Sequence, residues 1–257
     1  MTQFISYNSG LNGTLPDSWK SMSRLAILSL FSNKFSGTLP SSWSSMTALT
    51  NVRMDYNSLI GPLNPTWSSL TRMNILNFSS NKLTGPLPTT WSNIAGLANL
   101  NVNTNRLNGT LPNAWSALSN LTSVLFSLNQ FSGSLPSSWS TMTSLANLYL
   151  QINKLAGTFP DTWSKMAQLK ILHLENNSLS GTLPNSWSTM TTLNYLVGSP
   201  MNQGCLLPPT KASVGRIVSY RMRMHTVCIP YAMLLRTGYI DNCTVMIQGV
   251  ELWLVLP

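Results

Sequence analysis

The sequence predicts a β-rich, right-handed solenoid, with a parallel β-sheet on its concave face and short 3-10 turns and short strands on its convex side. Three residue types recur every 24 positions without insertion or deletion, and chance does not hold three types in phase for this long. The tryptophans are Trp19, Trp43, Trp67, Trp91, Trp115, Trp139, Trp163 and Trp187. The glycines are Gly13, Gly37, Gly61, Gly85, Gly109, Gly133, Gly157 and Gly181. The asparagines are Asn33, Asn57, Asn81, Asn105, Asn129, Asn153 and Asn177.

One aligned unit begins Leu-x-x-Leu-x-Leu-x-x-Asn-x-Leu at Leu169, which is the signature of a leucine-rich repeat. Leu172 and Leu174 are two apart, so both side chains point to one face of a short strand. Stacked units pair such strands in parallel, about 4.8 Å apart, and their leucines form a continuous core. We therefore expect a repeat domain over residues 1–208, with about eight repeats and the first incomplete. Residues 209–257 follow as a C-terminal cap, a small unrelated fold or an out-of-frame tail.

The other fixed positions of the unit have physical reasons. The Asn column lies where the chain leaves the strand, so its amides can bond backbone groups that the turn leaves unpaired and form a ladder. Gly181 permits a backbone angle or close approach that a side chain would block. Leu183-Pro184 is interpreted as a short edge-like strand on the opposite side, because proline donates no hydrogen bond.

The tryptophan column has two interpretations, an aromatic platform for sugars or a buried core. Trp187 and Met190 are three apart, which suits one inward-facing turn of 3-10 helix. Every tryptophan has an apolar residue at this spacing, so we expect core.

Both ends depart from the unit. Ser9 stands in the Asn column, and Phe4 and Ser6 fit the strand poorly, so we expect upstream residues to be missing. In the third copy the proline moves by one, to Pro65, which predicts a local distortion only. Toward the C-terminus Met201 replaces the ladder asparagine, and the period then disappears.

Composition excludes several classes. Only 8% of residues are charged, about a third of the usual share. The formal charge is +9, but the Lys and Arg residues are scattered along the sequence, so we expect no nucleic-acid binding. The three cysteines, Cys205, Cys228 and Cys243, form at most one pair and define no disulfide framework. We find no signal peptide and no apolar stretch long enough for a transmembrane helix.

Two resemblances follow from these motifs. The Leu-Ser-Gly-x-Leu-Pro run resembles the plant-type leucine-rich repeats of receptor-like kinase ectodomains. The fuller Gly-Thr-Leu-Pro-x-Ser-Trp-Ser-x-Met phrase, at residues 37–46 and 181–190, resembles the promastigote surface antigen and proteophosphoglycan-type surface proteins of kinetoplastids. That resemblance implies a secreted or lipid-anchored glycoprotein at the cell surface, with an interaction role. Asn242-Cys-Thr and the apolar end of the chain are a poor version of an anchor signal.

Strand positions between the core leucines predict the binding surface, since they vary at fixed geometry. The candidates on the concave face are Phe31, Arg53, Asp55, Tyr56, Asn77, Asn101, Leu125, Tyr149, Gln151, His173 and Glu175. The same rows hold Ser79, Asn103, Ser127, Leu128 and Ile152. The alternative is that these are merely solvated sheet positions.

Arg53 with Asp55 and His173 with Glu175 could be read as acid–base pairs. A surface ion pair is the simpler reading, because no third group orients the histidine and no nucleophile is marked. With no phosphate loop and no Cys/His metal spacing, we expect no enzyme, no metal and no cofactor.

Six Asn-x-Ser/Thr sequons are glycosylation candidates if the chain is secreted. They are Asn12, Asn77, Asn108, Asn120, Asn176 and Asn242. The leading functional hypothesis is a surface-displayed recognition or adhesion module that binds protein or glycan. The alternatives are the ectodomain of a receptor-like kinase and a structural surface-coat protein.

Overall fold

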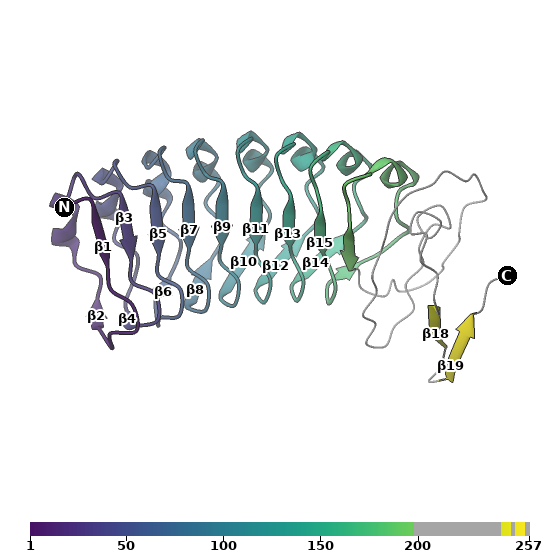
Figure 1. Cartoon of the computed structure of the whole chain (residues 1–257), viewed down its shortest axis with the longest axis horizontal. Helices are drawn as coiled ribbons and strands as arrows, with labels where there is room; N and C mark the ends of the chain where they lie inside the picture. Colours follow the sequence, from purple (N-terminus) through teal and green to yellow (C-terminus); the bar gives the residue numbers. More distant parts are fainter. Residues whose placement is uncertain (198–242, 248–249, 255–257) are drawn as a thin grey trace.

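The fold is a solenoid whose repeats stack along one axis (Figure 1). The computed structural model describes residues 1–197, 243–247 and 250–254. One strand of each repeat joins a nine-stranded parallel sheet, which we call the main sheet. Its strands are β1 (Gln3–Ile5), β3 (Ile27–Ser29), β5 (Asn51–Arg53), β7 (Ile75–Asn77), β9 (Asn99–Asn101), β11 (Ser123–Leu125), β13 (Asn147–Tyr149), β15 (Ile171–His173) and β17 (Tyr195–Val197). Each residue pairs with the residue 24 positions on, as in Leu148↔Leu172. The solenoid class that the repeat predicts is confirmed.

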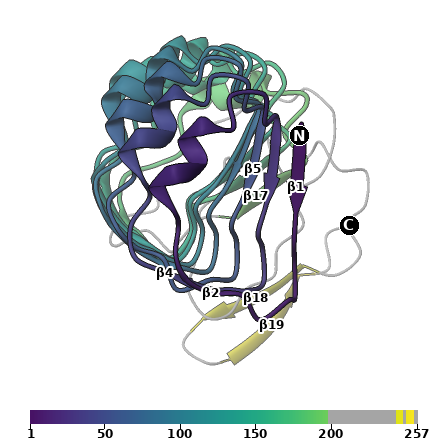
Figure 2. The same ribbon diagram turned by 90° about the vertical axis from the view of Figure 1, so that its left-hand side faces the viewer.

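A second row of short parallel strands lies beside the main sheet, at the bottom of Figure 2; we call it the lateral sheet. Its strands are β2 (Asn12–Thr14), β4 (Lys34–Ser36), β6 (Ile60–Gly61), β8 (Lys82–Gly85), β10 (Arg106–Thr110), β12 (Gln130–Gly133), β14 (Lys154–Gly157) and β16 (Ser178–Leu179). Its strands pair residues 22 positions apart, as Arg106 does with Thr84, whereas the main sheet pairs residues 24 positions apart.

A ridge of 3-10 helices completes each repeat, on the side away from the main sheet (Figure 2). The helices are η1 (Asp17–Ser21), η2 (Ser41–Ser45), η3 (Pro65–Ser69), η4 (Thr89–Asn93), η5 (Asn113–Ala117), η6 (Ser137–Thr141), η7 (Asp161–Lys165) and η8 (Asn185–Thr189).

The prediction of a strand at Leu183-Pro184 is wrong. The strand of that repeat, β16, ends at Leu179, and Pro184 is the N-cap of η8. Its extended φ and ψ of −62° and 140° suit the residue before a helix. The displaced proline of the third copy is accommodated in the same way. There Asn64 becomes the N-cap, and its side chain accepts a hydrogen bond from the Thr66 amide at 3.1 Å.

The tryptophans form a continuous column inside the solenoid. Seven are fully buried or nearly so, whereas Trp19, in the first repeat, is only partly buried. Three pairs of neighbouring indoles stack, among them Trp43 on Trp67 at 6.0 Å between ring centroids. Each buried indole N–H also donates to a backbone carbonyl of the preceding repeat, as Trp139 Nε1 does to Pro112 at 2.9 Å. Tryptophan therefore supplies large buried area and satisfies a buried carbonyl at the same time.

The ladder asparagines bind backbone groups of two repeats. Asn129 Nδ2 donates to the carbonyls of Val102, Phe126 and Ser127 at 2.9–3.2 Å. Its Oδ1 accepts from the Leu107 amide at 3.0 Å. One amide thus satisfies turn groups that the strands leave unpaired, both within its own repeat and in the preceding one.

The strands at the two ends of the described chain pair differently. The first copy pairs fully despite its degraded sequence, with Phe4 opposite Leu28. At the other end, β18 (Cys243–Ile247) and β19 (Val250–Leu254) pair antiparallel. The predicted boundary at residue 208, Cys205, Cys228 and Asn242 lie outside the described residues. The boundary and the cysteine pairing stay predictions.

Removing one buried indole tests the tryptophan column. Trp139→Ala is expected to lower the free energy of unfolding by about 3–5 kcal/mol, because it leaves a cavity and removes one hydrogen bond to the Pro112 carbonyl. The measurement is urea unfolding followed by far-ultraviolet circular dichroism. Trp19→Ala is the matched control, and at partial burial it should cost no more than about half as much. Equal losses in the two variants would contradict the role assigned to the column.

Candidate functional site

The outward face of the main sheet is the surface predicted to be concave, and its side chains come from three positions in each repeat. The predicted candidates at the third residue of each strand are exposed or half-buried. They are Arg53, Asn77, Asn101, Leu125, Tyr149 and His173. The row that follows each strand is more buried than predicted. Asp55, Ser79 and Ser127 are only 4–6% exposed. The chain bends at the next residue, and longer side chains shield these short ones, as Arg53 shields Asp55. Asp55 is therefore a support for the surface rather than a contact.

One row was missed by the sequence analysis. The first residue of each strand lies on the same face as the third, because side chains alternate with period two. Tyr195 in this row is 48% exposed, and Asn51, Asn99 and Asn147 are half-buried. The alternation that identified the core leucines also contained this signal. Tyr7 was missed as well, although it stands 24 residues before Phe31.

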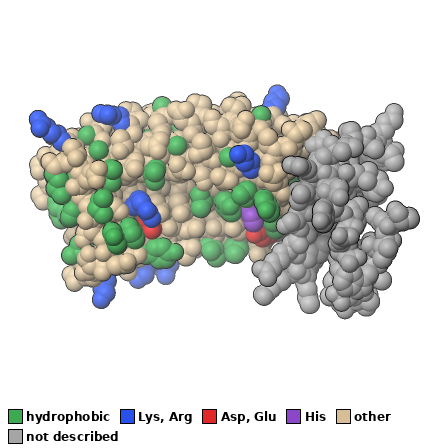
Figure 3. All heavy atoms as spheres, in the orientation of Figure 1, with side chains coloured by type: hydrophobic (Ala, Val, Ile, Leu, Met, Phe, Trp, Pro, Cys, Tyr) green, Lys and Arg blue, Asp and Glu red, His purple; other side chains and the backbone are tan. Residues whose placement is uncertain are grey.

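A cationic aromatic cluster lies toward the N-terminal end of this face (Figure 3, blue and red among green). Tyr7 stacks on Phe31 at 4.8 Å between ring centroids. The Arg53 guanidinium carbon lies 4.8 Å from the centroid of the Phe31 ring, and Arg53 Nε lies 3.5 Å from Asp55 Oδ1. The buried carboxylate and the ring hold the guanidinium in place, and the Arg53 side chain stays 47% exposed. We call these four residues the arginine cluster.

A second cluster lies toward the C-terminal end, around the purple histidine in Figure 3. His173 stacks on Tyr149 at 4.9 Å, and its Nδ1 lies 3.2 Å from Glu175 Oε1. Glu175 Oε2 and Gln151 Oε1 are buried and have no hydrogen-bond partner among the described residues. An unpaired buried acceptor costs about 1–3 kcal/mol. We call these four residues the histidine cluster.

Three large side chains flank the clusters from strained backbone. Tyr56, Leu128 and Ile152 have φ of 55–57° and are 61%, 45% and 42% exposed. A left-handed conformation is unfavourable for bulky residues and worst for a β-branched one. The same position holds Ser80 and Asn176 in other repeats, which tolerate it better. The positive φ recurs at this position in the other repeats, so the turn imposes it whatever the residue.

The centre of the face is neutral and polar. The Oδ1 atoms of Asn77 and Asn101 each accept a hydrogen bond from the backbone amide two residues on, at 3.1 Å. A glycan on Asn77 would cover this centre. Of the other sequons that the structure describes, Asn12 and Asn108 lie exposed on the lateral sheet, and Asn120 and Asn176 lie exposed in turns.

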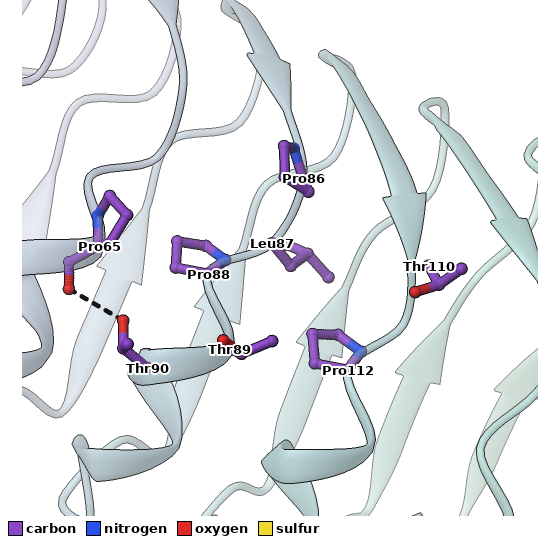
Figure 4. Close-up of a pocket in the computed structure, with 8 residues that line it drawn as sticks. All are labelled: Pro65, Pro86, Leu87, Pro88, Thr89, Thr90, Thr110 and Pro112. Carbon is purple, nitrogen blue, oxygen red and sulfur yellow. Dashed lines mark hydrogen bonds between the residues drawn. The ribbon is translucent and has the colours of Figure 1, made fainter.

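A hollow of about 310 Å³ lies between η3, η4 and the lateral sheet (Figure 4). Its lining is Pro65, Pro86, Leu87, Pro88, Thr89, Thr90, Thr110 and Pro112. None of these side chains ionises near neutral pH, and the Thr90 hydroxyl already donates to the Pro65 carbonyl at 3.0 Å. Over the described ranges, no three His, Cys, Asp or Glu residues gather as metal ligands would.

Comparison with known proteins agrees with this geometry. The Leucine Rich Repeat family matches residues 24–46, 72–94 and 168–190. The chain carries leucine-rich repeats. No curated protein sequence matches it significantly. The matched family describes a structural repeat and not an enzyme.

Solved plant receptor ectodomains share the fold. The ectodomain of the receptor kinase GASSHO1/SCHENGEN3 from Arabidopsis thaliana, in complex with CASPARIAN STRIP INTEGRITY FACTOR 2, is 29% identical with a TM-score of 0.75. The match covers 78% of this chain and 24% of that one. The Arabidopsis receptor kinase HAESA, in complex with the peptide hormone IDA and the co-receptor SERK1, is 28% identical with a TM-score of 0.72, over 82% and 37% of the two chains. A TDR receptor is 30% identical with a TM-score of 0.72, over 74% and 33%. The chain spans well under half the length of each.

Relieving the strain at Ile152 tests whether that side chain serves folding or binding. Ile152→Asn is expected to raise the free energy of unfolding by about 1 kcal/mol, because asparagine tolerates positive φ. Chemical denaturation measures the change. Ser80→Asn, at the same position of another repeat, is the control and should shift stability by less than about 0.5 kcal/mol. A destabilised Ile152→Asn protein would mean that the isoleucine is a packing residue.

Proposed function

We propose that this protein is a non-catalytic recognition module that binds a protein or peptide ligand on the outward face of the main sheet. The observation that carries the proposal is the pair of clusters on that face. Each combines a stacked aromatic pair with a charged group, and aromatic and arginine side chains are the residue types that dominate binding energy at interfaces.

The spacing of the clusters suits an extended ligand. Arg53 on β5 and His173 on β15 are five strand steps apart, about 24 Å at about 4.8 Å per step. An extended peptide of about seven residues spans that distance. The arginine cluster offers an exposed cation, and the histidine cluster offers a stacked ring pair beside a partly exposed carboxylate. The amide-rich centre between them suits hydrogen bonds to a peptide backbone.

The receptor ectodomains support this choice of ligand. Two of them, GASSHO1/SCHENGEN3 and HAESA, were solved with bound partners, among them a peptide hormone. We extend only the class, a peptide or protein, to this chain. A glycan is the alternative ligand, since stacked aromatics also suit sugars. A structural surface coat is the third possibility, and it requires no ligand on this face.

We also propose that the module is displayed outside the cell. The support is the extracellular nature of the receptor ectodomains it resembles and its surface of hydroxyl and amide groups. No helix of the described part of the chain is long and apolar enough to cross a membrane. The receptor ectodomain is the second candidate, favoured by TM-scores of 0.72–0.75. The resemblance to kinetoplastid surface antigens stays a prediction.

Substitution across the two clusters tests the proposed face. Peptides selected from a random displayed library on the full chain are titrated by fluorescence anisotropy. A variant with Arg53→Ala, Tyr149→Ala and His173→Ala is expected to weaken their binding at least about 30-fold, a loss of about 2 kcal/mol.

The matched control carries Arg24→Ala, Arg72→Ala and Lys165→Ala, all exposed and outside the main sheet. It should bind within about twofold of the parent. Equal binding by both variants would defeat the proposal, and a glycan array probed in parallel distinguishes sugar from peptide as the ligand class.

A further inference from the structure

We infer that the lateral sheet is a binding site for a linear acidic polysaccharide, separate from the face proposed above. Four cations that are far apart in the sequence each begin one of its strands. Lys34 opens β4, Lys82 opens β8, Arg106 opens β10 and Lys154 opens β14. All four are exposed. The Lys and Arg residues are scattered along the sequence, but the 24-residue repeat returns these four to one surface.

The strand geometry points these side chains to solvent. In each of the four strands the residue after the cation is buried core, namely Phe35, Leu83, Leu107 and Leu155. Because strand side chains alternate, the cation faces outward. Backbone hydrogen bonds join β4 to β6 as well, from the Ile60 amide to the Gly37 carbonyl at 2.9 Å. From β4 to β14 there are five strand steps, about 24 Å at about 4.8 Å each. We call Lys34, Lys82, Arg106 and Lys154 the basic stripe.

The basic stripe has a single sign of charge. Residues 1–197 contain only four acids, and none lies on the lateral sheet. Asp17 and Asp161 lie in η1 and η7, where they accept hydrogen bonds from Ser42 and Ser186 at 2.6 Å. The other two are Asp55 and Glu175, on the main sheet. The ion pairs among the described residues are those of Arg53 and His173, so the stripe is not neutralised there.

The surroundings of the stripe favour a polysaccharide. Across the strands the cations pair with Asn12, Thr84 and Ser132 and, at Lys82, with Ile60. Hydroxyls and amides beside a row of cations suit a ligand with sugar hydroxyls and repeated carboxylate or sulfate groups. A single-stranded nucleic acid would need aromatic platforms, and the lateral strands expose none. A membrane would gain from exposed apolar side chains, and among the lateral strands that the structure describes Ile60 alone provides a large one.

The test uses the full chain made without N-glycans, because Asn12 and Asn108 lie on this sheet. The probes are labelled dodecasaccharides of heparin and of polygalacturonate, a neutral dextran of equal length, oligothymidylate, and vesicles containing phosphatidylserine. Binding to one or both acidic oligosaccharides is expected. It should weaken from about 0.1 M to about 1 M salt, as the Debye length falls from about 10 Å to about 3 Å. The two oligosaccharides distinguish sulfate from carboxylate as the preferred anion.

Two variants with the same loss of charge decide the site. The stripe variant carries Lys34→Gln, Lys82→Gln, Arg106→Gln and Lys154→Gln. It should bind the acidic oligosaccharide at least about tenfold more weakly, since each lost basic residue weakens attraction to an anionic surface severalfold. The control carries Arg24→Gln, Arg72→Gln, Lys165→Gln and Lys170→Gln, all exposed elsewhere. It should stay within about twofold.

Several results would overturn the inference. They are equal losses in the two variants, no binding of either acidic oligosaccharide, and tighter binding to oligothymidylate or vesicles. Unfolding curves of both variants verify that they are folded. The variant with Arg53, Tyr149 and His173 replaced should keep full oligosaccharide binding. The proposal for the basic stripe and the proposal for the peptide face can therefore be disproved independently.

Discussion

The fold depends on polar side chains that bind the backbone of the neighbouring repeat. A parallel ladder pairs the strands, but it leaves the turns after them with unpaired amides and carbonyls inside the solenoid. The asparagine at each turn hydrogen-bonds four backbone groups with one side chain, as Asn129 does, and the indole N–H of each buried tryptophan binds one more carbonyl. An unsatisfied buried group costs about 1–3 kcal/mol. Because each of these side chains also bonds the preceding repeat, the same residue types must return at the same spacing. The exact period of 24 in the sequence is a consequence of these contacts.

These contacts also explain what the sequence could and could not predict. Core positions are set by residue type, so Leu172, Trp187 and Asn177 identified the strand, the 3-10 ridge and the turn without coordinates. Which side chains lie side by side on the surface depends on the register between paired strands. Residue type does not set that register. The lateral sheet pairs residues 22 apart whereas the main sheet pairs residues 24 apart. Nothing in the spacing of the tryptophans indicates that difference. The assignment of Leu183-Pro184 to a strand was wrong for another reason. Proline suits an edge strand and a helix cap equally well.

The candidate site shows the same division. Period two correctly placed Arg53, Tyr149 and His173 on one face, and applied consistently it would have added Tyr195. The period-two pattern could not predict which side chains of that face are buried. Asp55 and Glu175 occupy equivalent positions, yet Asp55 is 4% exposed and the Glu175 side chain 26%. Their neighbours in adjacent repeats differ, and those neighbours decide what remains accessible. The strained backbone under Ile152 is likewise invisible in the sequence, because it follows from the turn and not from the residue.

On a surface with few charged residues, each charge has a larger electrostatic effect on its surroundings. In most proteins Lys and Arg lie among acids, and their fields cancel within a Debye length of about 8–10 Å. Here the solvated surface is mainly hydroxyl and amide, so a cation keeps its field unless an acid is placed beside it. Arg53 and His173 have such acids, and both lie beside stacked rings. The basic stripe has none among the described residues, and its neighbours are short polar side chains. The same scarcity of charge therefore produces two kinds of surface, one suited to recognising shape and chemistry and one suited to attracting an extended anion.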